Sequence, residues 1–474
     1  MGSISDLETV LNDPSTMMDI GTERLWSIDY AEVEAFQLST IARRFSELRN
    51  RLGILNNLAE DIGITEISGV GDITALCFPH TTYKSYTEKF IENKEFGKLT
   101  NWLSAFTTHD LKSTDTSGCQ SMEEWISVLE RDTPIRPMCS SGTSGKISFF
   151  PKSTDEQLFS HYGYMFGNSG FRDEDDSGLQ TGEVDFFCPW PVASGHHNLP
   201  TAFRILRDFH YAGRPGKHVY TVGDGHWDLD MHWLSAKLQA AANRGETLQL
   251  DAKQADLRER LRQVRERELQ NKEAEWDAFL NELVVGHAGQ RVFVMAAAPQ
   301  LYSIALEAEK RDLTVTLTPD SYIQAGGGSG LRGTAFPDDW MDVVRRRIPH
   351  RINEVYGMSE INAVARLCSH GQFHFPPWVF MSVLDPDTGV PLAREGEVTG
   401  RLALFDLLPQ TYWGGCISGD RVKVQFSGEC GCGRKGPRMS PEIARYSSLK
   451  DDDKITCAVS AGAYERATDL TLTA

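Results

Sequence analysis

The sequence predicts an α/β protein with more than one lobe, and three observations support this prediction. Strand-like apolar runs alternate with helical patterns between residues 291 and 357, an order typical of a parallel sheet covered by helices. Short β runs joined by Gly, Asp and Pro turns begin after residue 375, which indicates a small β-rich subdomain. At 474 residues, the chain is longer than one hydrophobic core usually organises.

The first half of the chain is mainly helical in pattern. Residues 21–60 place Val33, Ile41 and Phe45 at helical spacing between charged residues, which predicts an amphipathic helix. Shorter helical patterns follow between residues 80 and 130, and residues 139–152 ("CSSGTSGKISFFPK") form a loop with a short strand. A buried strand is expected at 183–193. The charged stretch 252–285 predicts a solvated helix or helical pair rather than a coiled coil, because its apolar positions do not keep heptad spacing.

The second half carries the predicted sheets. Strands are expected at 291–297, 320–328 and 352–357, with helices at 303–311 and 340–348 between them. The β runs after residue 375 are "WVFMSVLDPDTGVPL", "GEVTGRLALFDLL" and "RVKVQFSG". We therefore expect a large α/β core at 1–375, a β-rich subdomain at 376–445 and a short C-terminal remnant at 446–474.

Charge and composition exclude several classes of function. The formal net charge of −18 argues against binding to nucleic acid, because the phosphate backbone would be repelled. No apolar stretch approaches the ~20 residues of a membrane span, and the acidic N-terminus does not resemble a signal peptide. Nine cysteines without regular spacing indicate reduced thiols. We expect a cytoplasmic protein.

The loop between residues 139 and 152 could bind phosphate. Glycines let the backbone approach a ligand closely, and amides and hydroxyls can donate to phosphate oxygens. The spacing matches neither a Walker loop nor a dinucleotide fingerprint, so a plain turn remains an equal alternative.

Three later segments favour a ligand site. "QAGGGSGLRG" (324–333) offers a flat backbone surface after a strand, suited to a purine. "EVYGMSEINA" (354–363) combines Tyr356, which can stack on a base, with Glu360, which can hold Mg²⁺ through hard oxygen atoms. "ISGDRV" (417–422) offers Asp420 as an acceptor for a ribose diol. Each segment also has an ordinary structural explanation, as a hinge, a helix start or a turn.

Taken in order, "SSGTSGK", "AGGGSG", "VYGMSE", "GEVTGRL" and "ISGDRV" resemble the core motifs of adenylate-forming enzymes, namely acyl-CoA synthetases, non-ribosomal adenylation domains and luciferases. The resemblance covers about residues 140–455. Residues 36–58 and "GECGCGR" (428–434) are more similar to the phenylacetate–CoA ligase branch and the acyl-protein synthetases of bacterial luminescence. The resemblance implies an N-terminal domain with two helix-flanked sheets, a β-rich subdomain and a truncated C-terminal lid.

The resemblance also implies a reaction and a set of site residues. An ATP- and Mg²⁺-dependent ligase would convert a carboxylic acid to an acyl-adenylate and pass the acyl group to a thiol. Ser359 would touch the α-phosphate, Glu360 would hold Mg²⁺, and Lys146 would serve the phosphates. His196 and His197 would flank the acyl pocket, with a surface histidine pair as an equal alternative. The implied nucleotide-binding residues are Ser140, Ser141, Gly142, Thr143, Ser144, Gly145, Gly326, Gly327, Gly328, Tyr356, Gly357, Asp420 and Arg445.

Two departures from the family pattern affect these expectations. Ser148 stands where a lysine is common, so Lys146 or Lys152 would have to compensate phosphate charge. Only 21 residues follow Asp453, fewer than the roughly 50 that a small domain needs. The lysine that such a domain usually supplies would then be replaced by other basic residues or by a partner protein.

The acyl acceptor stays open at this stage. Coenzyme A is one candidate, and a carrier protein or Cys457 of the chain itself is another; a buried strand cysteine is the more common explanation for Cys457. Cys430 and Cys432 form a C-x-C pair, which is only half of a zinc motif, and Cys368 with His370 could complete it. We do not expect zinc from this pattern.

The acid itself is expected to be aryl or fatty acyl. The rival from another class is a catalytically weak nucleotide-binding subunit that keeps the pocket and lacks the lysine.

Overall fold

The computed structural model describes residues 2–140, 146–243, 245–326 and 337–446. The chain divides into two compact units. Unit 1 contains residues 1–138, 148–167 and 358–474, and unit 2 contains residues 139–147 and 168–357. This division falls at Gly357/Met358, whereas the change in sequence pattern suggested a boundary after residue 375. Unit 1 is assembled from three separate segments, which local patterns cannot reveal. Residues 447–474, including most of the predicted remnant, lie outside the described part.

Unit 2 is built on a parallel β-sheet with the spatial order β10-β9-β8-β4-β6. Neighbouring strands pair in parallel throughout, for example with Val294 opposite Ile323 and Val355 opposite Gly326. The predicted alternation of strands and helices is confirmed, and with it the α/β class. The bounds are β4 (Asp185–Cys188), β6 (Val219–Thr221), β8 (Val292–Ala297), β9 (Tyr322–Gly326), β10 (Ile352–Gly357), α14 (Ala298–Lys310) and α15 (Trp340–Arg347).

The remaining described residues of unit 2 form a small parallel strand pair, three further α-helices and short helical turns. Strands β5 (Val192–Gly195) and β7 (Gly225–Trp227) pair with each other. The remaining elements are α11 (Asn198–Ile205), α12 (Leu229–Asn243) and α13 (Ala252–Asn281), with short helical turns η3 (Leu179–Thr181), η4 (Leu206–His210) and η5 (Glu282–Gly286).

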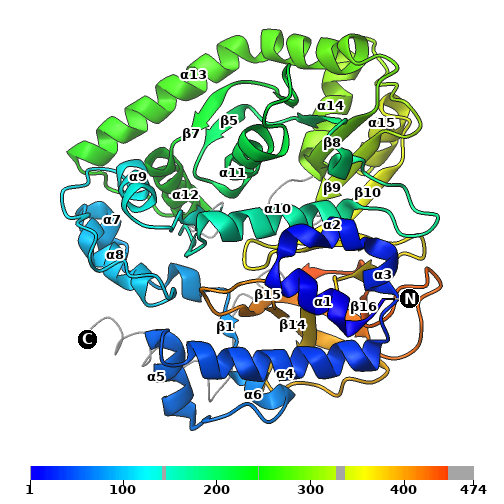
Figure 1. Cartoon of the computed structure of the whole chain (residues 1–474). Helices are drawn as coiled ribbons and strands as arrows, with labels where there is room; N and C mark the ends of the chain where they lie inside the picture. The colour runs from blue at the N-terminus through cyan, green and yellow to red at the C-terminus, as the bar shows by residue number, and fades with distance from the viewer. Residues whose placement is uncertain (1, 141–145, 244, 327–336, 447–474) are drawn as a thin grey trace. The chain divides into compact units, whose positions relative to one another are not determined.

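Helix α13 is a single helix of 30 residues and is the long green helix in Figure 1. Its first turn is fixed by a capping box in which Asp251 and Gln254 bond to each other's backbone amides. Much of the helix is exposed, and pairs such as Arg265–Glu268 (3.1 Å) lie at helical spacing along it. Only its C-terminal end packs into the sheet core, through Trp276, Phe279 and Leu280. This matches the prediction of a solvated helix.

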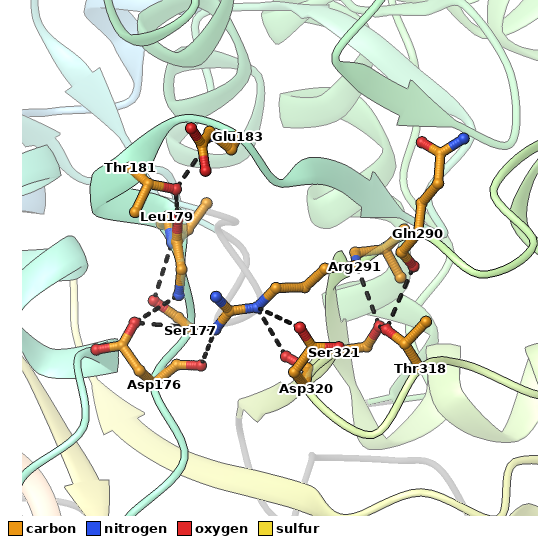
Figure 2. A network of polar contacts seen from close by, with 12 residues as sticks. Asp176, Ser177, Leu179, Thr181, Glu183, Gln290, Arg291, Thr318, Asp320 and Ser321 are labelled. Atoms are coloured by element: carbon orange, nitrogen blue, oxygen red, sulfur yellow. Dashed lines mark hydrogen bonds and ion pairs between the residues drawn. The ribbon is translucent and has the colours of Figure 1, made fainter.

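A polar network joins the segment before β4 to the starts of β8 and β9, as Figure 2 shows. The Arg291 guanidinium donates to the carbonyl oxygens of Asp320 (2.8 Å) and Asp176 (2.7 Å). Beside it, the Ser321 hydroxyl accepts from the Val292 amide (3.1 Å) and bonds to the Thr318 hydroxyl (2.8 Å). One arginine thus satisfies carbonyl groups from two segments that are distant in sequence.

We expect Arg291→Ala to lower the free energy of unfolding by about 2 kcal/mol, because two charge-assisted hydrogen bonds to backbone carbonyls are lost. Urea denaturation measures the change. Arg351→Ala is the matched control: Arg351 forms an ion pair with Asp175 (3.2 Å) in which both side chains are about half exposed, and such pairs contribute about 0–1 kcal/mol. Equal losses in the two variants would contradict this role for Arg291.

Unit 1 contains a largely antiparallel sheet with the order β13-β14-β15-β16-β12-β11. Strand β15 also pairs in parallel with β1 and antiparallel with β17. The β runs predicted after residue 375 are confirmed as β13, β14 and β15. The bounds are β1 (Phe78–Pro79), β11 (Val364–Leu367), β12 (Phe373–His374), β13 (Val379–Leu384), β14 (Glu397–Asp406), β15 (Gly415–Gln425), β16 (Arg438–Met439) and β17 (Ala444–Arg445).

The helices of unit 1 come mostly from the first 132 residues. Helix α4 contacts β13, and its buried face includes Val33, Ile41 and Phe45, the spacing predicted from the sequence. The predicted 21–60 helix is interrupted, because α5 begins separately at Gly53. The bounds are α1 (Ile4–Asn12), η1 (Pro14–Thr16), α2 (Met17–Ile20), α3 (Thr22–Trp26), α4 (Tyr30–Leu48), α5 (Gly53–Ile62), α6 (Val70–Ala75), η2 (Thr82–Lys84), α7 (Lys89–Glu92), α8 (Phe96–Ser104) and α9 (Met122–Asp132).

Helix α10 (Thr154–Asn168) packs against the chain segment around Asn362. Gly163 makes this contact possible, because a Cβ atom at this position would lie 1.9 Å from the Asn362 carbonyl oxygen. Gly167, one turn later, approaches the Val364 backbone in the same way. The short strands β2 (Met138–Cys139) and β3 (Phe149–Phe150) precede this helix, and β3 confirms the strand predicted within 146–151. None of the described helices is long and apolar enough to cross a membrane.

Candidate functional site

Two of the predicted nucleotide-binding residues meet in unit 1, where strands β15 and β17 pair. Asp420 lies in β15 directly opposite Arg445 in β17. The Arg445 Nε donates to a carboxylate oxygen of Asp420 at 2.7 Å. The Asp420 side chain is 3% exposed and the Arg445 side chain 42% exposed. Strand pairing therefore holds a carboxylate and a guanidinium together, with the guanidinium reaching solvent.

Glu360 lies within electrostatic reach of this pair. The carboxyl group of Glu360 is partly buried, and burial raises its pKa above the ordinary value. The positive charges of Arg445 and Lys152 oppose this rise, and the negative charge of Asp420 adds to it. The charges of Asp420 and Arg445 thus act on Glu360, although 60 residues separate Glu360 from Asp420 in the sequence.

Lys152 belongs to a buried polar network in unit 1. Its ammonium donates to the Asn362 side-chain oxygen (2.8 Å) and the Ser160 hydroxyl (2.9 Å). The backbone amide of Asn362 donates to the Asp406 carboxylate (2.6 Å), and the side-chain nitrogen of Asn362 donates to the Tyr412 hydroxyl (3.1 Å). Lys152 is 1% exposed, and burial lowers its pKa to about 8. Asn362 lies two residues after Glu360. Through its hydrogen bond to Asn362, Lys152 therefore positions the segment that follows Glu360.

We expect Lys152 to make stability depend on pH between about 8 and 10.5. Within this window the unfolded chain binds more protons than the folded protein, so the free energy of unfolding rises with pH. Between pH 8 and 9.5 this rise amounts to about 1.5 kcal/mol. Denaturant titrations of wild type and Lys152→Met at several pH values measure it, and the variant should lack this component. Lys98→Met, at an exposed lysine, is the control that should retain it. Parallel pH profiles for wild type and Lys152→Met would contradict the assignment.

Two further motif segments lie at the carboxyl ends of neighbouring parallel strands in unit 2. Gly326 is the last residue of β9, and Tyr356 and Gly357 end β10. Because Val355 pairs with Gly326, the three residues lie side by side at one edge of the sheet. In open α/β sheets, ligands bind at this edge. Ser359 follows β10 in sequence and is partly buried.

The beginning of the Ser/Thr/Gly loop lies next to the predicted acyl-pocket histidines in unit 2. Cys139, directly before Ser140, forms a parallel bridge with His197. The His197 ring accepts from the Leu199 amide (3.3 Å), which caps α11, and it stacks on Trp227 with ring centres 4.3 Å apart. Burial lowers the pKa of His197 to about 3, so its imidazole is neutral at physiological pH. Such a ring can line an apolar pocket but does not supply a positive charge.

The Ser/Thr/Gly loop is described at its two ends. Ser140 and Lys146 are described and are partly buried, and they flank the gap in the loop. The predicted residues outside the described part of the chain are Ser141, Gly142, Thr143, Ser144, Gly145, Gly327, Gly328 and Cys457.

Residues that hold neighbouring segments of unit 1 in place were not predicted from the sequence. Glu156 fastens the start of α10 to the segment after β14: its carboxylate accepts from the amides of Gln410 (3.0 Å) and Thr411 (2.9 Å). It also forms a capping box with Ser153. The "STDE" pattern at 153–156 signals this helix start. No local pattern signals the roles of Asn362 and Asp406.

A buried group of sulfur and nitrogen atoms also occurs in unit 1. The side chains of Cys368, His374, Cys430 and Cys432 lie within 4.8 Å of one another. His370, the histidine suggested by the sequence, is instead exposed. His374 lies in strand β12 with its side chain buried, whereas His370 lies in the exposed turn between β11 and β12.

Comparisons with known proteins give the following similarities. No family model and no curated protein matches the sequence. Among solved structures, 2-hydroxyisobutyryl-CoA ligase in an open conformation with 2-HIB-AMP and CoA is similar over 88% of this chain and 70% of that chain, with 13% identity and a TM-score of 0.46. ATP-bound MatB from Rhodopseudomonas palustris is similar over 61% of this chain and 45% of that chain, with 15% identity and a TM-score of 0.32.

A third solved structure with similarity is the luciferase-like enzyme of the nonluminescent mealworm Zophobas morio. It matches over 65% of this chain and 56% of that chain, with 11% identity and a TM-score of 0.32. The chain thus spans about half the length of MatB and of the luciferase-like enzyme.

Proposed function

We propose that the protein is an adenylate-forming ligase that activates a carboxylic acid with ATP. The carboxylate oxygen attacks the α-phosphate of ATP, the bond to the β-phosphate breaks, and acyl-adenylate and pyrophosphate form. A thiol then attacks the acyl carbon, giving a thioester and releasing AMP. Coenzyme A is the thiol that we favour, and the acid is an aryl or fatty acyl carboxylate.

The observation that carries this proposal is the grouping of Glu360, Asp420 and Arg445. Glu360 and Asp420 come from two of the ordered motifs, "VYGMSE" and "ISGDRV", and Arg445 pairs with Asp420 across strands β15 and β17. In the proposed site, the Asp420 carboxylate binds the ribose hydroxyl groups, with Arg445 beside it. For unit 2, we propose that Tyr356 stacks on an adenine ring and that Gly326 lies along the edge of that ring.

The residues present suit Mg²⁺ and a triphosphate. Glu360 offers carboxylate oxygens, the ligand type that Mg²⁺ prefers. The phosphates would bind along Ser140–Lys146, where hydroxyls, amides and one lysine are concentrated. Bound Mg²⁺ would neutralise charge on the phosphate oxygens. The protein's own contribution is to orient the acid toward the α-phosphate and to exclude water from the acyl-adenylate.

Exchange of labelled pyrophosphate into ATP tests the first half-reaction. Purified full-length protein should catalyse this exchange only when a suitable acid is present, with benzoate-type acids and C4–C16 fatty acids as the panel. If the protein binds labelled ATP but catalyses no exchange with any acid, the result would instead favour the catalytically weak nucleotide-binding subunit.

The acceptor is tested separately with a labelled acid that supports exchange. Acyl transfer that requires coenzyme A supports our preferred reaction. Transfer to the protein without coenzyme A, lost in Cys457→Ala, would support self-loading. Transfer only to an added carrier protein would favour an acyl-protein synthetase.

A further inference from the structure

The four side chains of Cys368, His374, Cys430 and Cys432, defined here as the Cys₃His cluster, come from two segments of unit 1. Cys368 follows β11, and His374 lies in β12. The turn between these strands is closed by a hydrogen bond from the Cys368 amide to the Gln372 carbonyl (2.8 Å). The segment between β15 and β16 contributes Cys430 and Cys432. A second tight turn, in which the Gly433 amide donates to the Cys430 carbonyl (2.9 Å), shapes this segment.

Two distances within the Cys₃His cluster match those of a tetrahedral zinc site. A zinc ion bound at ~2.3 Å to sulfur and ~2.0 Å to nitrogen separates two sulfur ligands by about 3.8 Å and a sulfur from a nitrogen by about 3.5 Å. The Sγ atoms of Cys368 and Cys430 are 3.8 Å apart, and the Cys432 Sγ lies 3.5 Å from the His374 Nε2. These two separations therefore have the values of a tetrahedral zinc site, and all four ligand atoms lie within 4.8 Å of one another.

Burial and charge also suit a structural metal. The four residues are between 2% and 8% exposed, so solvent has little access to them. Three thiolates and one Zn²⁺ carry a net charge of −1. The buried guanidinium of Arg434 lies 3.8 Å from the Cys432 Sγ and supplies the balancing positive charge. This guanidinium also lies over the Trp26 ring (5.2 Å), which itself contacts the edge of His374.

We propose that the Cys₃His cluster binds one structural Zn²⁺ ion that joins the β11–β12 turn to the β15–β16 segment. Four protein ligands fill a tetrahedral site, so no position is left for substrate. The C-x-C pair did not predict zinc because its two partners lie more than 50 residues earlier in the chain. The proposal is independent of the ligase reaction.

Metal analysis of the purified full-length protein tests the proposal. Protein prepared with a histidine-free affinity tag, under reducing conditions, and passed over a chelating resin should contain about one zinc per chain by mass spectrometry of metals. Blocking the thiols with a mercurial should release this zinc to a colorimetric chelator. Cobalt in place of zinc should give the thiolate-to-metal and d–d absorption bands of a tetrahedral site.

Variants assign the ligands. Cys432→Ser and His374→Ala should lose at least nine-tenths of the zinc, whereas His370→Ala and Cys119→Ser, at an exposed histidine and a buried cysteine elsewhere, should retain it. If the ligand variants do not fold, removal of zinc from wild type by a strong chelator should lower its melting temperature by several degrees. Wild type with less than about one-tenth of a zinc and no cobalt bands would overturn the proposal. So would a Cys368–Cys430 disulfide under the same reducing conditions, or full zinc in a Cys430→Ser/Cys432→Ser double variant.

Discussion

Glu360→Gln is expected to lower carboxylate-dependent ATP–pyrophosphate exchange by about 100-fold or more, an effect typical of removing one group that stabilises transition-state charge. Glutamine keeps the size of the side chain but loses the negative charge that would hold Mg²⁺. Exchange rates at saturating acid and ATP measure the effect. Glu354→Gln is the matched control, because Glu354 is exposed on the same strand-to-turn segment and lies outside the grouping with Asp420 and Arg445.

The fold should tolerate Glu360→Gln. Burial already disfavours the charged form of Glu360, so a neutral side chain of the same size costs little. We therefore expect the melting temperature to change by no more than a few degrees while the exchange rate falls. If the exchange rate of Glu360→Gln stays within threefold of the wild-type rate, Glu360 does not take part in the reaction, whatever the stability of the variant.

The pH dependence of the exchange gives a second measure of Glu360. Because burial raises its pKa, the carboxylate form is lost as pH falls through a value higher than the ordinary 4.5 of a glutamate. The acid limb of the rate profile should therefore lie above pH 4.5 in wild type. Mg²⁺ competes with the proton for the carboxylate, so higher Mg²⁺ concentrations should move this limb to lower pH.

Much of the α/β architecture follows from local patterns. The strand and helix alternation between 291 and 357 is readable because buried parallel strands are short apolar runs and the helices between them carry charged faces. Gly326 and Tyr356 lie at the same edge of the sheet because they stand at the ends of neighbouring parallel strands. Asp420 was predicted from its turn, but its partner strand at Arg445 is only two residues long and has no pattern of its own.

The structural features that were not predicted depend on contacts between segments that are distant in the sequence. Lys152 and Asn362 are 210 residues apart, and each alone resembles an ordinary loop residue. The division of the chain into two units has the same origin, because residues 148–167 cross into unit 1 through the packing of α10. His370 lies in the exposed turn after β11 and His374 lies buried in β12, and the spacing of residues does not show which of the two faces inward.

Gly163→Ala is expected to destabilise unit 1 by about 3 kcal/mol or more, because the added methyl group would overlap backbone that cannot move independently. The new Cβ would lie 1.9 Å from the Asn362 carbonyl oxygen and 2.9 Å from its carbonyl carbon. Denaturant unfolding measures the loss. Gly71→Ala is the control: it is also helical, in α6, and no atom lies within 4 Å of its added Cβ. This control should gain about 0.5–1 kcal/mol, because alanine favours the helix more than glycine does.

Gly163→Ala also connects the packing of α10 to the proposed chemistry. The Asn362 side chain accepts a hydrogen bond from the Lys152 ammonium, and Asn362 is two residues from Glu360. Displacing the Asn362 carbonyl therefore moves the segment that carries Glu360. Under conditions in which the variant remains folded, we expect exchange activity to fall by more than the folded fraction alone explains. Circular dichroism of the same samples gives that fraction. If Gly163→Ala matches Gly71→Ala in both stability and exchange, α10 does not position the Glu360 segment.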